Sequence, residues 1–260
     1  MKVAGLQTDI AWEDPAENFR RCEPLLAEAA SSGVRLAVLP EMFATGFSMN
    51  ADKVAPFAEA TQEFLSDSAR RLGIWVAGGF AEPFDPRPRN ACAVFDPEGR
   101  KKLVYHKIHP FSLAGEHKQF TPGDAVPTVE IEGIRVTPLI CYDLRFPEPF
   151  RLAASATDLF LVVANWPSPR ISAWTSLLAA RAIENQCYVL GVNRVGEGDE
   201  KQYTGDSALI DPMGACLDSA SEEVALVSGE VHSQEVHDVR QHFSFLADRR
   251  PGTYRAIEDR

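Results

Sequence analysis

The chain has 260 residues, of which 45% are hydrophobic and 24% are charged, an ordinary balance for a soluble globular protein. The formal net charge of −11 argues against a nucleic-acid or anionic-membrane partner, because both need a basic face. No apolar run approaches the length that crosses a bilayer, and the N-terminus lacks the long apolar segment of a signal peptide. This length allows one large α/β domain or two small ones.

The cysteines are odd in number, widely spaced and mostly set in apolar sequence: Cys22, Cys92, Cys141, Cys187 and Cys216. This pattern is typical of reduced thiols in a cytoplasmic protein rather than of a disulfide framework. His106, His109 and His117 cluster near Glu116, but their spacing does not match a common metal-ligand motif. The sequence therefore predicts neither a metal nor another cofactor.

Apolar strands and amphipathic helices alternate along the chain. Residues 14–17 supply an N-cap, a proline at N1 and a capping-box glutamate for a first helix, which Gly33 closes. Apolar stripes predict helices at residues 57–72 and 171–178, and a short helix is expected at 148–155. Short apolar runs predict strands at residues 2–8, 36–39, 74–80, 90–95, from 103 onward, and at 134–140, 159–164, 188–192, 207–210 and 224–231.

No linker, repeat or low-complexity run interrupts this order. Strands and helices alternate first, and closer strand pairs come later, which predicts one α/β domain with mixed sheets over residues 1–242. The tail from Phe243 mixes apolar residues with charged and turn-forming ones. We expect residues 243–260 to form a C-terminal arm.

Three reactive side chains, Glu41, Lys107 and Cys141, each come at or just after the end of an expected strand. Taken singly, Glu41 and Lys107 have an ordinary interpretation as solvated loop charges, and Cys141 as a buried cysteine. Ligands bind beyond the carboxyl ends of the strands in α/β sheets, so the three side chains are expected to converge on one crevice.

The chemistry of these residue types fits nucleophilic catalysis. The strand at 134–140 delivers Cys141 to a sharp turn before the helix that starts near Pro147. A carboxylate can deprotonate a thiol if the site excludes enough water to raise the pKa of the carboxylate. Lys107 and the backbone N–H of Tyr142 can stabilise a developing oxyanion. No serine lies in a Gly-x-Ser-x-Gly turn, so the cysteine is the better nucleophile candidate.

Residues 40–43, 105–111 and 140–148 resemble the signature segments of the nitrilase superfamily of carbon–nitrogen hydrolases. Further similar segments follow in family order over nearly the whole chain, at residues 115–117, 164–167, 180–185 and 205–207. The resemblance implies a four-layer αββα sandwich and a catalytic Glu-Lys-Cys triad at Glu41, Lys107 and Cys141. It also implies that Glu116 is a second glutamate that holds the lysine or the substrate amine, and that the chain forms a homodimer or higher homo-oligomer.

The residues after Cys141 read Tyr-Asp, which resembles amidases, whereas true nitrilases more often carry Trp-Glu. Residues 109–117 and 165–167 are most similar to the bacterial ω-amidase (omega-amidase) branch of the superfamily. Those enzymes hydrolyse the terminal amide of 2-oxoglutaramate or 2-oxosuccinamate to a dicarboxylate and ammonia through a thioester. The resemblance therefore implies a cysteine-dependent amidase that acts on a small carboxylate-bearing amide.

A carboxylate-bearing substrate needs a cation in the pocket, and Arg145 is the nearest candidate along the chain. An ion pair between Arg145 and Asp143 or Glu148 is the structural alternative. Tyr142 and two further aromatic residues are candidate pocket walls or core residues, namely Phe47 and Trp166.

Other activities remain open at this point. An N-carbamoyl-amino-acid hydrolase, an aliphatic amidase and a nitrilase would use the same triad. An inactive binding or assembly protein on the same scaffold is an alternative of another class, against which the intact triad argues.

Overall fold

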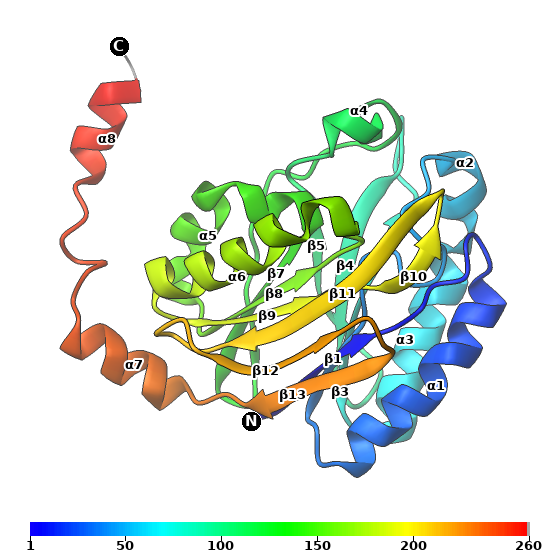
Figure 1. Cartoon of the computed structure of the whole chain (residues 1–260), viewed down its shortest axis with the longest axis horizontal. Coiled ribbons are helices and arrows are strands. Elements are labelled where there is room, and N and C mark those ends of the chain that lie inside the picture. Colours follow the sequence, from blue (N-terminus) through cyan, green and yellow to red (C-terminus); the bar gives the residue numbers. More distant parts are fainter. Residues whose placement is uncertain (259–260) are drawn as a thin grey trace.

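Two β-sheets form the centre of the computed structural model, which describes residues 1–258 (Figure 1). The first sheet has the spatial order β13 (Ala225–Glu230), β1 (Lys2–Gln7), β2 (Leu36–Val38), β3 (Trp75–Glu82), β4 (Arg89–Phe95) and β5 (Lys101–His106). The second sheet has the order β10 (Val195–Gly198), β11 (Lys201–Ile210), β9 (Tyr188–Val192), β8 (Leu159–Val163), β7 (Ile134–Ile140) and β6 (Val129–Ile131), with β12 (Cys216–Ser221) paired to β11.

Helices cover the outer face of each sheet. The first sheet packs against α1 (Pro15–Ser31) and α3 (Ala58–Leu72), and the second against α5 (Pro147–Ala153) and α6 (Ile171–Asn185). The expected αββα sandwich of four layers is therefore confirmed. None of the helices described in residues 1–258 is long and apolar enough to cross a membrane.

The two sheets face each other across a continuous apolar core. Val38 of β2 and Val136 of β7 belong to the same buried cluster, and both are fully shielded from solvent. A Cβ added at Gly5 on β1 would lie 2.7 Å from a methyl carbon of Val192 on β9. The sheets approach so closely there that only glycine fits.

Local signals explain where the long helices begin and end. The side chain of Asp14 accepts a hydrogen bond from the backbone N–H of Glu17 at 3.1 Å, and Pro15 follows at the start of α1. Gly73 ends α3 in the left-handed conformation, with φ of 66°. Residues 168–170 form a 3₁₀ turn directly before α6 begins at Ile171.

Several elements were not expected from the sequence. They are β6, β10, β12, α2 (Ala51–Val54), α4 (Glu116–Gln119), α7 (Ser233–His242), α8 (Pro251–Glu258) and the 3₁₀ turns η1 (Ala55–Phe57), η2 (Ser112–Ala114), η4 (Ala154–Ala156) and η5 (Ser168–Arg170). The turn expected at Cys141 is the 3₁₀ turn η3 (Cys141–Arg145). Strand β11 also begins earlier than the expected residue 207, at Lys201. The first half of β11 carries polar residues and forms a hairpin with β10. It contains no apolar run from which a strand could be predicted.

The chain leaves the sandwich near its C-terminus. Figure 1 shows α8 apart from the sheets, beyond α7. Phe245 is 61% exposed and Ile257 is 62% exposed. The boundary at residue 242 and the arm at 243–260 stay predictions, and residues 259–260 lie outside the described part of the chain.

Candidate active site

Cys141 lies where β7 gives way to the 3₁₀ turn η3, as the sequence predicts. Its φ of 47° is unusual for a residue other than glycine. Such a conformation costs free energy and persists only where surrounding contacts enforce it. One such contact is the buried carboxylate of Asp143, which accepts a hydrogen bond from the backbone N–H of Ile140 at 3.0 Å. The strained turn presents the thiol at the edge of the sheet.

The strand directions bring the predicted residues to one end of the sandwich. Glu41 follows β2, and Lys107 follows β5, which runs in the same direction because two antiparallel pairings separate it from β3. Cys141 follows β7, which is parallel to β8. All three side chains are buried. The structure therefore places the three residues together, in the arrangement that the sequence predicts.

Lys107 lies between two carboxylates. Its Nζ is 2.9 Å from Oε1 of Glu41 and 2.8 Å from Oε2 of Glu116. Burial opposes the charged ammonium, but Glu116 and Glu41 outweigh it and raise the pKa of Lys107. Burial also raises the pKa of Glu116, which Lys107 lowers in part. The lysine is thus held as an ammonium inside the protein.

The surroundings of Cys141 favour the protonated thiol. Burial raises the pKa of the Cys141 thiol well above its usual range, and the Glu41 carboxylate raises it further, while Lys107 lowers it. The thiol therefore becomes a nucleophile only when a neighbouring base removes its proton. Glu41, the base that the sequence predicts, is the carboxylate with the largest effect on this pKa.

Two asparagines that the sequence did not single out as site residues fix the orientation of Glu41. Asn90 donates from Nδ2 to Oε1 of Glu41 at 2.7 Å and to Oε1 of Glu116 at 2.8 Å. The backbone N–H of Asn165 donates to Oε2 of Glu41 at 2.9 Å. Asn165 lies just after the end of β8, as Glu41 lies just after the end of β2. Its position after a strand could therefore have indicated Asn165 as a site residue. Asn90 is a polar residue near the start of the apolar strand β4. This break in the apolar pattern is the only sequence feature that could have indicated Asn90 as a site residue.

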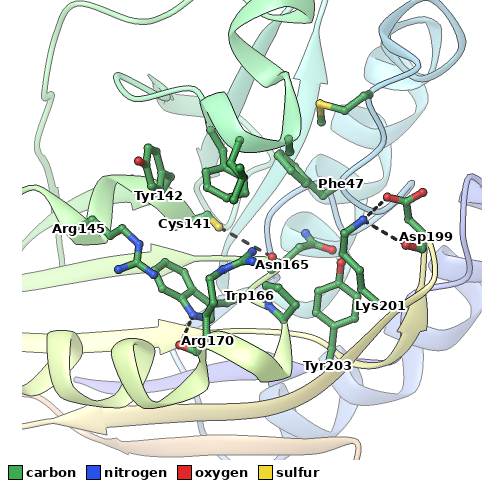
Figure 2. Close-up of a pocket in the computed structure, with 15 residues that line it drawn as sticks. Phe47, Cys141, Tyr142, Arg145, Asn165, Trp166, Arg170, Asp199, Lys201 and Tyr203 are labelled. Atoms are coloured by element: carbon green, nitrogen blue, oxygen red, sulfur yellow. Dashed lines mark hydrogen bonds and ion pairs between the residues drawn. The ribbon is translucent and has the colours of Figure 1, made fainter.

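The thiol opens onto a pocket of about 270 Å³ (Figure 2). Its lining residues are Phe47, Met49, Phe111, Leu113, Ala114, Cys141, Tyr142, Arg145, Asn165, Trp166, Pro167, Arg170, Asp199, Lys201 and Tyr203. The predicted wall residues Phe47, Tyr142 and Trp166 are among them. Glu41, Lys107 and Glu116 lie behind this lining, where Lys107 Nζ is 4.9 Å from the ring centroid of Phe47.

Arg145 lines the pocket from an exposed position. Its guanidinium carbon lies 4.9 Å from the ring centroid of Trp166. In the described part of the chain it forms no ion pair, so the alternative of a pair with Asp143 or Glu148 is not observed. Asp143 instead accepts hydrogen bonds from the hydroxyl of Tyr105 and the backbone of His109.

The histidines near Glu116 have other partners. Nε2 of His106 lies 2.6 Å from a carboxylate oxygen of Glu82, and Nδ1 of His109 lies 2.8 Å from one of Asp143. Within residues 1–258, no group of three or more His, Cys, Asp or Glu side chains is arranged to hold a metal ion.

A sandwich of two sheets and two helical layers, with a buried glutamate, lysine and cysteine at one end, defines a carbon–nitrogen hydrolase. The Carbon-nitrogen hydrolase family matches residues 2–241. The chain belongs to this family and is a hydrolase that acts on carbon–nitrogen bonds in amides.

Several relatives are similar over nearly their full length. The chain is 34% identical to 2-oxoglutaramate amidase of Bacillus subtilis (strain 168), over 97% of this chain and 98% of that protein. It is 36% identical to omega-amidase YafV of Escherichia coli (strain K12), over 95% and 96%. The crystal structure of XC1258 from Xanthomonas campestris, a CN-hydrolase superfamily protein with an arsenic adduct in the active site, is 34% identical with a TM-score of 0.90, covering 96% of this chain and 97% of that one.

Proposed function

We propose that the protein is an ω-amidase, which hydrolyses the terminal amide of a small carboxylate-bearing substrate of the 2-oxoglutaramate or 2-oxosuccinamate type. The observation that carries this proposal is the charge of the pocket onto which Cys141 opens. Its lining includes Arg145 and Arg170, and neither pairs with a carboxylate in residues 1–258. A protein of net charge −11 thus presents cations around its reactive thiol, which attracts an anionic substrate. The names of two relatives, 2-oxoglutaramate amidase and omega-amidase, agree with this substrate class.

The first half of the proposed reaction forms a thioester. Glu41 takes the proton of Cys141, and the thiolate sulfur bonds to the amide carbon while the carbonyl electrons move to oxygen. The ammonium of Lys107 and the backbone N–H of Tyr142 stabilise the oxyanion. Glu41 then gives its proton to the leaving nitrogen, the carbon–nitrogen bond breaks, and ammonia departs.

The second half releases the acid. Glu41 deprotonates a water molecule, whose oxygen attacks the thioester carbon. The tetrahedral intermediate expels the sulfur of Cys141, which recovers its proton from Glu41, and the carboxylic acid leaves. Glu116 supports both halves because it holds Lys107 in place at 2.8 Å.

Ammonia release across a panel of substrates tests the proposed function. The panel contains ω-amides with a carboxylate, plain aliphatic amides, N-carbamoyl amino acids and nitriles. We expect the highest kcat/KM for a carboxylate-bearing ω-amide. Preference for a neutral amide or a nitrile of the same length would contradict the proposal, as would carbon dioxide release from a preferred carbamoyl substrate. An inert binding protein would release no ammonia from any of them.

We also propose that the enzyme is a cytoplasmic homodimer or higher homo-oligomer. All five cysteines are free thiols, which suits a reducing compartment. Leu152 on α5 is 78% exposed and Ile183 on α6 is 53% exposed, on the helical layer outside the second sheet. Exposed apolar residues on such a face favour contact with a second copy. Sedimentation velocity of the Leu152→Glu, Ile183→Glu double variant should show a smaller species than the unaltered chain, and an unchanged assembly would exclude this interface.

A further inference from the structure

We propose that Arg170 is the residue that selects a carboxylate-bearing amide, by binding the substrate carboxylate at the opposite end of the molecule from the reacting amide. This inference rests on the proposed function and names the side chain that binds the negatively charged group of the substrate. Arg145, the candidate from the sequence, is exposed, whereas Arg170 is only partly exposed. A cation that is less accessible to water binds a carboxylate more strongly.

The backbone of Arg170 is fixed beside the reactive turn. Arg170 ends the 3₁₀ turn η5, where its backbone N–H donates to the carbonyl of Pro167 at 3.0 Å. Its carbonyl accepts a hydrogen bond from Nε1 of Trp166 at 2.8 Å. Trp166 directly follows Asn165, which holds Glu41. Figure 2 shows Arg170 and Trp166 on the same side of the pocket as Asn165, opposite Tyr142.

The guanidinium of Arg170 rests on an aromatic ring instead of a carboxylate. Its central carbon lies 5.1 Å from the ring centroid of Phe111. A ring face positions a cation but leaves its N–H donors available for another partner. No ion pair to Arg170 is found among residues 1–258. The lining holds two other basic residues: Arg145 is exposed, and Lys201 is paired with Asp199. Arg170 is therefore the pocket cation that combines partial burial with an unneutralised charge.

Phe111 connects Arg170 to the catalytic cluster. Its backbone N–H donates to Oε2 of Glu116 at 2.5 Å, and Glu116 holds Lys107. The loop that supports the Arg170 guanidinium is thus fixed relative to the group proposed to stabilise the oxyanion. An amide at Cys141 and a carboxylate at Arg170 are then the two ends of one short substrate, in a pocket whose volume of about 270 Å³ suits a small molecule.

The test compares Arg170→Met with Arg170→Lys and with the control Arg20→Met, which removes a paired, exposed cation from α1, outside the pocket lining. Arg170→Met should lower kcat/KM for 2-oxoglutaramate by about 100-fold, mainly by raising KM, because a charged partner is lost. Arg170→Lys should recover part of this loss, since it keeps the charge but not the two-pronged geometry. Arg20→Met should change kcat/KM by less than about threefold, because an exposed surface pair contributes little.

A second measurement does not depend on turnover. Iodoacetamide is neutral and alkylates the Cys141 thiol, and 2-oxoglutarate, a dicarboxylate, should slow this reaction by occupying the pocket. Arg170→Met should be alkylated at the unaltered rate but lose the protection by 2-oxoglutarate. A variant that keeps full protection, or whose alkylation rate falls as much as its turnover, would overturn the assignment of Arg170.

These outcomes separate the two proposals. If the unaltered protein does not hydrolyse 2-oxoglutaramate or other carboxylate-bearing ω-amides, the proposed function fails, whatever the variants show. If it does and Arg170→Met keeps the same kcat/KM, the function stands and the role of Arg170 is wrong.

Discussion

At the scale of single residues, the ammonium of Lys107 decides whether the site can exist inside the protein. Glu41 and Glu116 are fully buried, and a buried carboxylate is costly unless it is paired. Lys107 lies within 2.9 Å of both, and Asn90 supplies a hydrogen bond to each. The same lysine therefore holds the carboxylates in place and faces the thiol.

Replacing Lys107 should damage both stability and activity. Lys107→Met leaves two buried carboxylates without a counter-charge, which should lower the free energy of unfolding by about 3–5 kcal/mol and abolish ammonia release. Urea unfolding followed by circular dichroism measures the first effect. The matched control is Lys118→Met, at an exposed position, with an expected change within about 0.5 kcal/mol. Equal stabilities of the two variants would show that the lysine does not neutralise the pair.

The sequence predicted the site residues that directly follow apolar strands. It did not predict residues that reach the site only through contacts made in the folded protein. Glu41, Lys107 and Cys141 could be found because strand ends meet at one edge of a sheet. The role proposed for Arg170 could not, because it depends on a 3₁₀ turn that sets its side chain over Phe111, a residue distant in the sequence. Arg145 was chosen for its closeness to Cys141 along the chain; it does line the pocket, and its binding of substrate stays a prediction.

At the scale of elements, Asp143 joins the turn that carries Cys141 to the segment that carries Lys107. Its carboxylate is fully buried and accepts from the hydroxyl of Tyr105 at 2.7 Å and from the backbone N–H of His109 at 3.0 Å. Lys107 lies midway between these two residues. The backbone N–H of Ile140, just before Cys141, donates to the same carboxylate at 3.0 Å. The contact thus sets the position of η3 relative to the end of β5.

Asp143→Asn should loosen this connection. An amide has one acceptor oxygen, so donors now satisfied by the carboxylate lose their partner, and we expect a loss of about 1–3 kcal/mol in stability. Because Cys141 then shifts relative to Lys107, kcat should fall by about 10-fold or more with little change in KM. The rate of Cys141 alkylation by iodoacetamide should change as well.

The exposed Asp124→Asn is the matched control for this effect and should behave as the unaltered protein. A purely structural role for Asp143 would lower stability without changing kcat or the alkylation rate of the folded enzyme.

Strands could be predicted where their own residues form an apolar run, and not where pairing with another segment defines them. Buried strands such as β8 and β9 were predictable because they are continuous apolar runs. The first half of β11 was not, because its residues are mostly polar. It is a strand because it pairs with β10 in a hairpin, and its composition does not indicate this pairing. That hairpin brings Lys201 and Tyr203 to the pocket, so the sequence could not predict this wall of the site.

At the scale of the whole molecule, the core makes stability depend on pH through buried thiols. Burial raises the pKa of Cys22, Cys92 and Cys187 from 9.0 to about 12 in each case. Above pH 9 the unfolded chain therefore loses these protons before the folded chain does. Deprotonation favours the unfolded state, so the stability associated with these thiols is present below pH 9 and falls as the pH rises toward 12.

The free energy of unfolding should fall by about 1.4 kcal/mol per pH unit for each buried thiol in this range. Urea unfolding between pH 8 and pH 10.5, under reducing conditions, measures the slope. A triple variant with alanine at the three positions should be less stable at pH 8 but lose stability less steeply as the pH rises. Parallel slopes for the triple variant and the unaltered chain would show that the thiols do not govern this dependence.

One α/β domain with mixed sheets could be predicted from the order of the segments, whereas the four-layer sandwich was implied by the resemblance to the nitrilase superfamily. What the sequence left open is the sign of the charge around the thiol. That property depends on which of the surface charges are paired, as Lys201 is with Asp199, and which remain available, as Arg170 does.

The most direct test of the central claim is the mass of the enzyme quenched in acid during turnover of a carboxylate-bearing ω-amide. The account predicts an added mass equal to the substrate's acyl group, located on the peptide that contains Cys141 and absent from Cys141→Ala, which should also release no ammonia. Ammonia release by folded Cys141→Ala at the unaltered rate, or an acyl group found on a different residue, would contradict it.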